Sequence, residues 1–345
     1  MHEIAILFSW LFCALRYTKG MVVKMIRFIT MRLLMMIPTL LGIALVVLLF
    51  IVITPGDPAR LLLGDQVSEE ELEELRIELG LRDPFHVRYV NYISNILRGD
   101  FGTSFRTNRS VASEMAQRLP YSLMLVGISL GLALLIGIPL GIYAATRQYT
   151  WKDNAAIFAS LFCVSMPSFW FALLLIQLLG VRLGWLPPSG VDSWQGWVLP
   201  AITGALGFAA TIARQMRSNL LEVIRQDYIT TARAKGLSEA RVLYRHGLKN
   251  AIIPVIMVVG SVFGVAMGGS IITEVIFSIP GLGSYSVSAL LNRDYPVIQS
   301  SVLIMSALFA VVLLVVDVAF AFIDPRIRSQ YSRKKSKKIS KKGAA

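Results

Sequence analysis

The chain has 345 residues, of which 55% are hydrophobic and only 16% are charged, and its formal net charge is +13. Ordinary soluble domains carry about 25% charged residues, so this composition excludes a typical soluble protein. The basic residues flank apolar runs and do not form a separate domain, so we expect no nucleic-acid partner.

Uncharged runs long enough to cross a bilayer recur along the chain. Each exceeds the roughly 18 residues at which a transmembrane helix is expected. The six runs cover residues 33–56, 119–146, 154–181, 193–213, 250–273 and 295–316. In lipid, an apolar segment satisfies its own backbone polar groups by forming a helix. We therefore predict an all-α integral membrane protein with six transmembrane helices.

Residues 1–24 form an N-terminal extension of uncertain status. Their uncharged stretch, residues 4–15, is too short to span a bilayer and lacks the preceding basic residues of a signal peptide. Met21 and Met25 are alternative starts of the protein. We assign the first transmembrane helix to residues 25–56.

Residues 57–117 carry the signals of an ordered helical domain outside the membrane. Ser68 and Glu71 form a capping box, and Gly80 suits the left-handed position that ends a helix. The acidic face at residues 69–78 is either a docking surface for a soluble partner or a solvated helix face. The solvated face is the favoured interpretation.

The lysines indicate the orientation of the chain. They lie before the first span, after the second, between residues 235 and 249, and in the tail at 323–345. These places share one side of the membrane if six spans alternate, and positive charge marks that side as the cytoplasm. Both termini are therefore expected in the cytoplasm, with the basic tail near anionic membrane lipid.

Motifs of known catalytic sites are missing from the sequence. The chain has no G-x-x-x-x-G-K-[ST] loop for a nucleotide and no H-E-x-x-H or G-x-S-x-G pattern. Cys13 and Cys163 fit neither a disulfide framework nor a metal ligand set. We predict no catalytic residue, no metal site and no cofactor on this chain. Asp317 is the one acid expected within a span, where helix packing is favoured over a proton relay.

A short basic segment, "TTARAKGLSEARVLYRHGLKNAIIP" at 230–254, interrupts the apolar runs. Gly236 supplies a helix stop and Ser238 a new N-cap, which predicts helix, turn, helix. Ala232, Ala234 and Gly236 leave the turn without side-chain bulk, so another protein could approach its backbone closely. Basic side chains rim the turn at Arg233, Lys235, Arg241 and Arg245. A plain basic connector is the alternative.

This segment resembles the EAA loop of the permease subunits of ATP-binding-cassette (ABC) importers. Gly236, Pro254 and Ala232 hold places of that pattern, whereas Thr230 stands where it has glutamate and Thr231 where it has its first alanine. The departure is typical of the dipeptide and oligopeptide branch. Further stretches that resemble this branch lie at 38–64, 99–120, 181–190, 274–299 and 324–328. The resemblance covers residues 25–328.

The resemblance implies a type I importer permease fold with its shared transmembrane domain at 118–322, in the bacterial plasma (inner) membrane. It implies a second homologous permease subunit, two cytoplasmic ATPases that hold ATP and Mg, and an external solute-binding protein. The 230–254 loop would couple ATP hydrolysis to transport. Its coupling residues would be Thr231, Ala232, Arg233, Ala234, Lys235, Gly236, Leu237 and Glu239.

The stretch "FSIPGLGSY" at 277–285 combines an apolar anchor with small residues just outside the fifth span. This composition suits a re-entrant gate, and an ordinary external turn is the alternative. The candidate gate residues are Phe277, Pro280, Gly281, Leu282 and Gly283.

The resemblance favours di- or oligopeptides as the solute, and leaves nickel, glutathione or another small solute as alternatives. A transition-metal path would require imidazole or thiolate ligands, yet no histidine falls in an expected span and Cys163 stands alone there. A secondary transporter would show broken helices and coupling-ion sites, which the sequence does not indicate. A signalling or scaffold protein that transports nothing is a third hypothesis.

Overall fold

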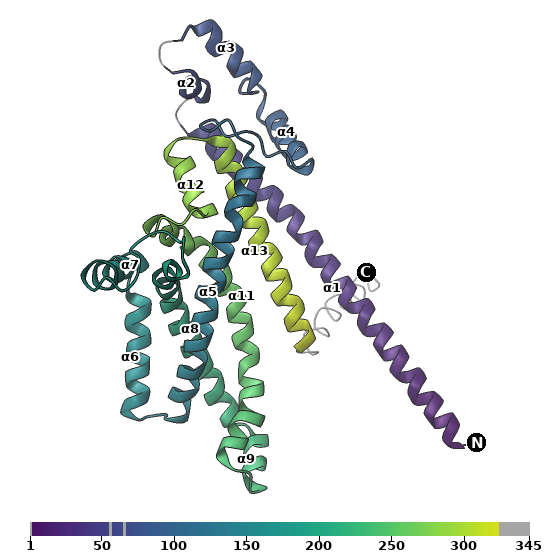
Figure 1. Cartoon of the computed structure of the whole chain (residues 1–345). Helices are drawn as coiled ribbons and strands as arrows, with labels where there is room; N and C mark the ends of the chain where they lie inside the picture. The colour runs from purple at the N-terminus through teal and green to yellow at the C-terminus, as the bar shows by residue number, and fades with distance from the viewer. Residues whose placement is uncertain (1, 55–56, 65–66, 324–345) are drawn as a thin grey trace, which may run out of the picture. The chain divides into compact units, whose positions relative to one another are not determined.

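The computed structural model of the chain describes residues 2–54, 57–64 and 67–323, which are helical apart from their connections and one isolated bridge between Thr103 and Ser110 (Figure 1). The predicted tail from residue 324 onward lies outside these described residues. The all-α prediction is confirmed.

The chain divides into two compact units, which are described separately. The first contains residues 1–39 and 310–345, and therefore the start of α1 (His2–Ile53) and the end of α13 (Tyr295–Ile323). Within it, Nη1 of Arg32 lies 2.9 Å from Oδ2 of Asp317. The helix α1 already begins at His2, and its part from Met25 to Ile53 is long and apolar enough to cross a membrane.

The second unit, residues 40–309, contains most of the helical bundle. Its long helices are α5 (Val111–Thr146), α8 (Val198–Ile224) and α11 (Leu248–Ile276). The short helix α12 (Leu282–Leu291) follows α11. Five helices in the described chain are long and apolar enough to span a membrane, and the number becomes six if a bent helix pair counts as one span.

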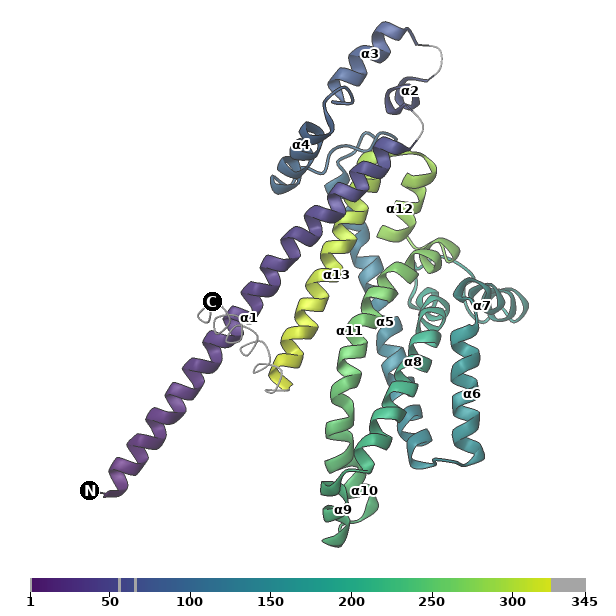
Figure 2. The same ribbon diagram turned by 180° about the vertical axis from the view of Figure 1, so that it is seen from behind.

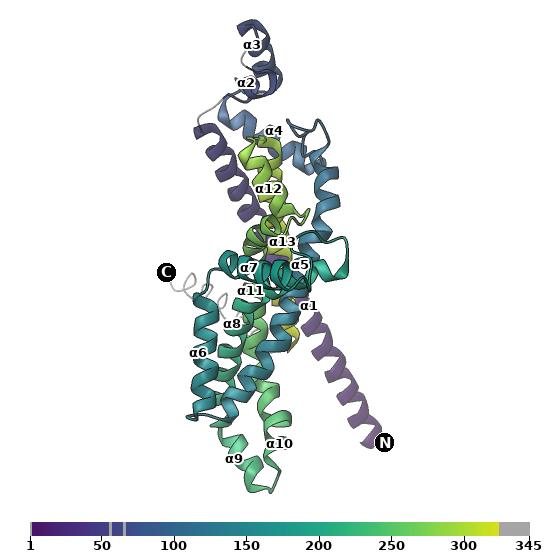
Figure 3. The same ribbon diagram turned by 60° about the vertical axis from the view of Figure 1, so that its left-hand side comes forward.

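The predicted span at 154–181 is not one straight helix. It is formed by α6 (Trp151–Ser165) and α7 (Ser168–Leu175), which continues as the π-helix η1 (Ile176–Arg182). The two halves are bent by 97° relative to each other. Figure 3 shows α6 and α7 on either side of this bend. Pro167 explains the break, because proline disfavours helical geometry at the residue before it, and Met166 is extended there (ψ 122°).

Helices α5 and α8 pack closely against each other. A Cβ atom at Gly137 would lie 2.6 Å from the Ala209 carbonyl oxygen, and one at Gly141 would lie 2.5 Å from that of Ala213. Real side chains cannot occupy such positions. The two glycines, four residues apart, thus allow the close backbone approach by which small residues associate helices in lipid.

Asp153 at the start of α6 is tied to α8 by a buried ion pair. Nε and Nη2 of Arg217 donate to its two carboxylate oxygens over 2.6 and 2.7 Å. The backbone N–H of Tyr149 also donates to Oδ2. Asp153 is almost completely buried. The pair fixes α6 against α8 at the end of the bundle where α6 begins.

The segment after α1 folds into α2 (Pro58–Leu63), α3 (Glu69–Glu78) and α4 (Phe85–Leu97). The capping box of Ser68 and Glu71 is present, and Gly80 is left-handed with φ +65°. These sequence predictions are confirmed. Leu72 supplies the buried side chain of α3.

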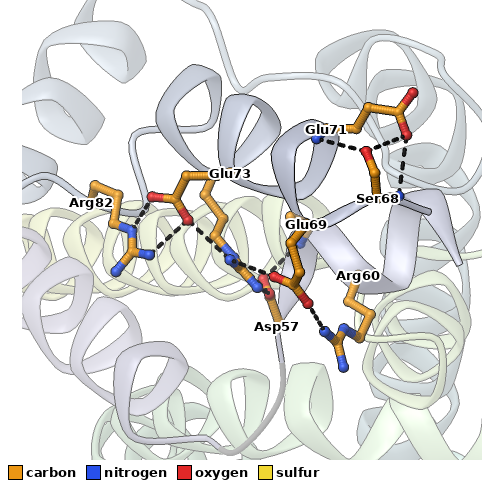
Figure 4. Close-up of polar contacts among 9 residues, drawn as sticks. Asp57, Arg60, Ser68, Glu69, Glu71, Glu73 and Arg82 are labelled. Atoms are coloured by element: carbon orange, nitrogen blue, oxygen red, sulfur yellow. Dashed lines mark hydrogen bonds and ion pairs between the residues drawn. The ribbon is translucent and has the colours of Figure 1, made fainter. Parts of the chain in front are cut away.

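Two of the six glutamates of α3, Glu69 and Glu73, are paired with arginines (Figure 4). Glu69 accepts from Arg60 over 2.7 Å, and Glu73 accepts from both Arg76 and Arg82. Arg76 also donates to Asp57, the N-cap of α2. The face is therefore less negative than the sequence alone indicates, which weakens its interpretation as an acidic docking surface.

This network predicts that the segment of residues 57–82 is sensitive to acid. Hydrogen bonds from Arg82 and then Arg76 lower the pKa of Glu73 to about 2, from an ordinary value of 4.5. Because the folded pKa lies below the unfolded one, the stabilisation is complete above pH 4.5 and is lost as the pH falls toward 2. We expect residues 57–82 to lose protection from pepsin as the pH falls from 4.5 to 2, when their cleavage rate is divided by that of an unfolded substrate at the same pH.

The matched control for this acid effect is Arg82→Met. The Arg82–Glu73 pair is exposed and contributes little to stability, so we expect only a small difference in cleavage rate between the variant and the parent. The ratio of cleavage rates between Arg82→Met and the parent should be above one at pH 4.5 and approach one at pH 2. A ratio that does not change with pH would contradict the role given to Glu73.

Candidate functional site

The 230–254 loop lies at one end of the second unit, and α12 lies toward the opposite end, with α2, α3 and α4 beyond it (Figures 1 and 2). The loop begins within α9 (Asp227–Ala234) and includes α10 (Glu239–Arg241) and the π-helix η3 (Val242–Gly247). It ends within α11. The turn between α9 and α10 occurs at Gly236, which is left-handed with φ +76°. Sequence reasoning located this turn correctly.

The loop has a small apolar core of its own. Ile229, Ala232 and Val242 are buried together, with Leu237 partly buried against them. Ala232 therefore supports the turn from inside, and the expectation that it leaves an open outer surface is wrong. Its spacing of three residues from Ile229 places both on one helix face.

The outer surface of the turn is formed by the remaining predicted residues. The exposed residues are Thr231, Arg233, Ala234, Lys235, Gly236 and Glu239. A Cβ atom at Gly236 would meet no heavy atom within 4 Å, so the space around the turn is open within this chain. The turn can therefore receive a close-fitting surface from another protein.

A bidentate ion pair closes the turn. Nε and Nη2 of Arg233 donate to the two carboxylate oxygens of Glu239 over 2.8 and 3.2 Å. The pair joins the end of α9 to the start of α10, and it offsets the charge that Arg233 was expected to present. A turn held by a packed core and an ion pair can transmit a push as a rigid body.

The 277–285 loop folds back into the bundle. Phe277 and Ile279 are buried in a cluster with Leu125, Ala172 and Leu199, which come from three other helices. Leu282, Gly281 and Gly283 are also buried, whereas Pro280 is exposed. The backbone N–H of Gly190 donates to the Phe277 carbonyl over 2.8 Å. The loop is therefore packed against the bundle along most of its length and is not a solvated turn.

Glu274 is a buried acid that sequence reasoning did not single out. Its side chain is fully buried near the end of α11. Ser122 of α5 donates to Oε1 over 2.7 Å, and the backbone N–H of Ser284 donates to Oε2 over 2.9 Å. The sequence contained one signal for this residue, because Glu274 stands shortly before the 277–285 stretch. In the sequence this acid was used only as the end of the uncharged run 250–273.

Other acids also lie within the long helices. The candidate spans that start at Val111 and Trp151 include Glu114 and Asp153, both buried. The expectation that Asp317 is the one acid in a span is therefore wrong, because the helices extend beyond the uncharged runs. Its contact with Arg32 favours the packing role that was predicted for Asp317.

A half-open pocket of about 380 Å³ lies in the second unit, between α5, the bent pair, α8 and α11. Its wall is mostly apolar, with the hydroxyl-bearing side chains of Ser129, Ser168, Ser270 and Thr273 among it. Cys163 also lines it. No group of three or more potential metal ligands occurs among the described residues. The cavity is suited to a small solute held by apolar and hydroxyl contacts.

The chain belongs to the family of binding-protein-dependent transport system inner membrane components, which it matches over residues 137–329. Residues 25–126 match the N-terminal region of the same family of membrane components. It is therefore a multi-pass inner-membrane permease subunit of an ABC importer, and its family consists of transport components, not catalytic enzymes.

Curated relatives support this assignment along most of the chain. The glutathione transport system permease protein GsiC of Salmonella typhi is 44% identical over 304 residues, 88% of this chain and 99% of the relative. GsiC of Escherichia coli K12 is 43% identical over the same shares. Among solved structures, an inward-facing MetNI methionine ABC transporter matches with a TM-score of 0.52 at 17% identity, covering 61% of this chain and 96% of that one. The last comparison shows the type I fold.

Proposed function

We propose that this chain is one of two homologous permease subunits that carry small peptides into the cell by alternating access. Two cytoplasmic ATPases would hydrolyse ATP, and an external binding protein would deliver the solute. The observation that carries the proposal is the 230–254 loop, because its Gly236 turn is left-handed, exposed and open to a partner surface. This chain has no P-loop, so the driving force must come from another subunit.

The gate and the cavity support the same mechanism. The 277–285 loop is buried at the opposite end of the bundle from the Gly236 turn, and the cavity lies between helices that connect these two ends. A displacement of the turn by the ATPases would move α8 and α11 as rigid bodies. The solute would then gain access to one side of the membrane at a time.

Small peptides are the solute class that we propose, with glutathione as a particular candidate. Relatives that share 43–44% identity are named glutathione transport permeases, and glutathione is itself a tripeptide. The cavity wall of apolar and hydroxyl-bearing residues accommodates peptides of varied side chains, while the binding protein would select among them.

Growth of a deletion strain tests the solute class. A strain that lacks the gene and requires an amino acid should fail to grow on a peptide supplying it, and should grow on the free amino acid. Accumulation of labelled glutathione should be measured in parallel. Normal uptake of peptides and glutathione, with loss of nickel accumulation, would contradict the peptide assignment but not the importer class.

The orientation of the chain is tested by labelling single cysteines in intact cells. We propose that both termini are cytoplasmic, because lysines gather on that side. Cysteines at Glu70 and Ser193 should react with an impermeant external thiol reagent, and one at Glu239 should react only after lysis. All three side chains are exposed, so accessibility within the fold is matched. Labelling of Glu239 but not Glu70 would reverse the proposed orientation.

A further inference from the structure

The start of α12 is capped by two side chains from other helices. The first N–H groups of a helix have no acceptor within it and need one from elsewhere. The N–H of Leu282 donates to Oγ of Ser122 over 2.8 Å, and that of Ser284 donates to the Glu274 carboxyl group over 2.9 Å. The positive end of the helix dipole also favours an acidic group at this place.

The glycines of the loop allow this arrangement. A Cβ atom at Gly281 would lie 2.7 Å from Oγ of Ser122 and closer still to the Glu274 carboxyl group. One at Gly283 would lie 2.9 Å from Oε2 of Glu274 and 2.8 Å from Cα of Ile271. The backbone of the loop is therefore wrapped directly around the carboxyl group, with no room for side chains.

Ser122 connects the three elements. Its hydroxyl donates to Oε1 of Glu274 on α11 and accepts from Leu282 on α12, while Ser122 itself belongs to α5. All of these atoms are buried, so water does not replace a contact that is lost. A change in the distance between α5 and α11 must then disturb the loop, since a buried polar group left without a partner is unfavourable.

We propose that Glu274 is the positioning residue of the gate: with Ser122 it caps α12 and links the shape of the 277–285 loop to the spacing of α5 and α11. The gating role rests on the proposed transport function, whereas the link itself is a property of this chain. Movement of the two helices during the transport cycle releases the loop, and their return re-forms the cap.

Hydrogen exchange of the purified chain with its partner subunits tests the link directly. Ser122→Ala and Glu274→Gln should each speed exchange of the Leu282 to Ser284 amides by about tenfold. Glutamine keeps an acceptor for Ser122 but turns an NH₂ group toward the Ser284 amide. The remaining amides of α5 and α11 should exchange as in the parent.

Ser129→Ala is the matched control for Ser122→Ala. Ser129 lies on the same helix and is also buried, and its hydroxyl has no hydrogen-bond partner among the described residues. Its replacement should leave exchange at 282–284 unchanged. Unchanged exchange in Glu274→Gln, or an equal loss of protection along all of α5 and α11, would overturn the proposal.

Uptake per ATP hydrolysed separates this inference from the transport function. In proteoliposomes the parent complex should couple the two processes, and Glu274→Gln should lower the ratio below that of the parent. If the parent complex transports no peptide, the proposed function fails while the exchange result still decides the link. If the parent transports and Glu274→Gln keeps both its exchange pattern and its ratio, the inference alone fails.

Discussion

Replacement of Gly236 by valine is expected to abolish most uptake while the protein remains in the membrane with its ATPases bound. A β-branched residue in left-handed geometry costs about 1–2 kcal/mol, which shifts a conformational equilibrium by about a factor of ten. The added side chain would also project into the open space that a partner surface is proposed to fill. The measurement is the initial rate of solute uptake, normalised to the amount of assembled complex.

Two further variants separate strain from steric exclusion. Gly236→Asn keeps the left-handed turn at low strain, so partial uptake is expected if strain dominates. Gly99 is a matched control, because it follows α4 as Gly236 follows α9 and is left-handed with φ +79°. No heavy atom lies within 4 Å of its Cβ position. Each of the two glycine N–H groups also donates over 2.9 Å to the carbonyl three residues before it. Gly99→Val should therefore spare coupling. Parental uptake in Gly236→Val with the ATPases bound would refute the coupling role.

Removal of Arg217 is expected to produce the largest loss of stability. Arg217→Met leaves Asp153 buried without its bidentate partner, which costs about 3–5 kcal/mol for a buried pair. The apparent unfolding temperature of the detergent-purified protein should fall clearly, with release of α6 from α8. The measurement is thermal unfolding at fixed detergent concentration.

The double variant Asp153→Leu with Arg217→Met tests the explanation of that loss. Replacing both members of a buried pair with apolar residues is often neutral, so the double variant should regain much of the lost stability. Arg82→Met, which breaks an exposed pair with Glu73, is the control and should lower the unfolding temperature much less than Arg217→Met does. If the double variant is less stable than Arg217→Met alone, the loss has another cause.

Local signals made part of the structure predictable. The capping box at Ser68 and the left-handed turns at Gly80 and Gly236 depend on residues within one or two helical turns, so the sequence contains their cause. The bend at Pro167 was also visible as a proline inside an uncharged run. Length and hydropathy suggested one span there, and the local effect of proline on the preceding residue decided the outcome.

Long-range contacts could not be predicted in the same way. Glu274 meets Ser122 across 152 positions of sequence, and Asp153 meets Arg217 across 64. Charge patterning counted both acids only as the ends of apolar runs. Their burial becomes reasonable once the fold supplies partners, because a buried charge requires compensation from groups that are distant in sequence.

ATP-driven uptake into proteoliposomes tests the central claim most directly. The permease pair, its ATPases and the binding protein would be reconstituted with ATP on the ATPase side, and labelled di-, tripeptides and glutathione offered on the other. The account predicts uptake that requires both ATP and the binding protein and that falls about tenfold in Gly236→Val. Uptake driven by an ion gradient without ATP, and unaffected by Gly236→Val, would contradict it.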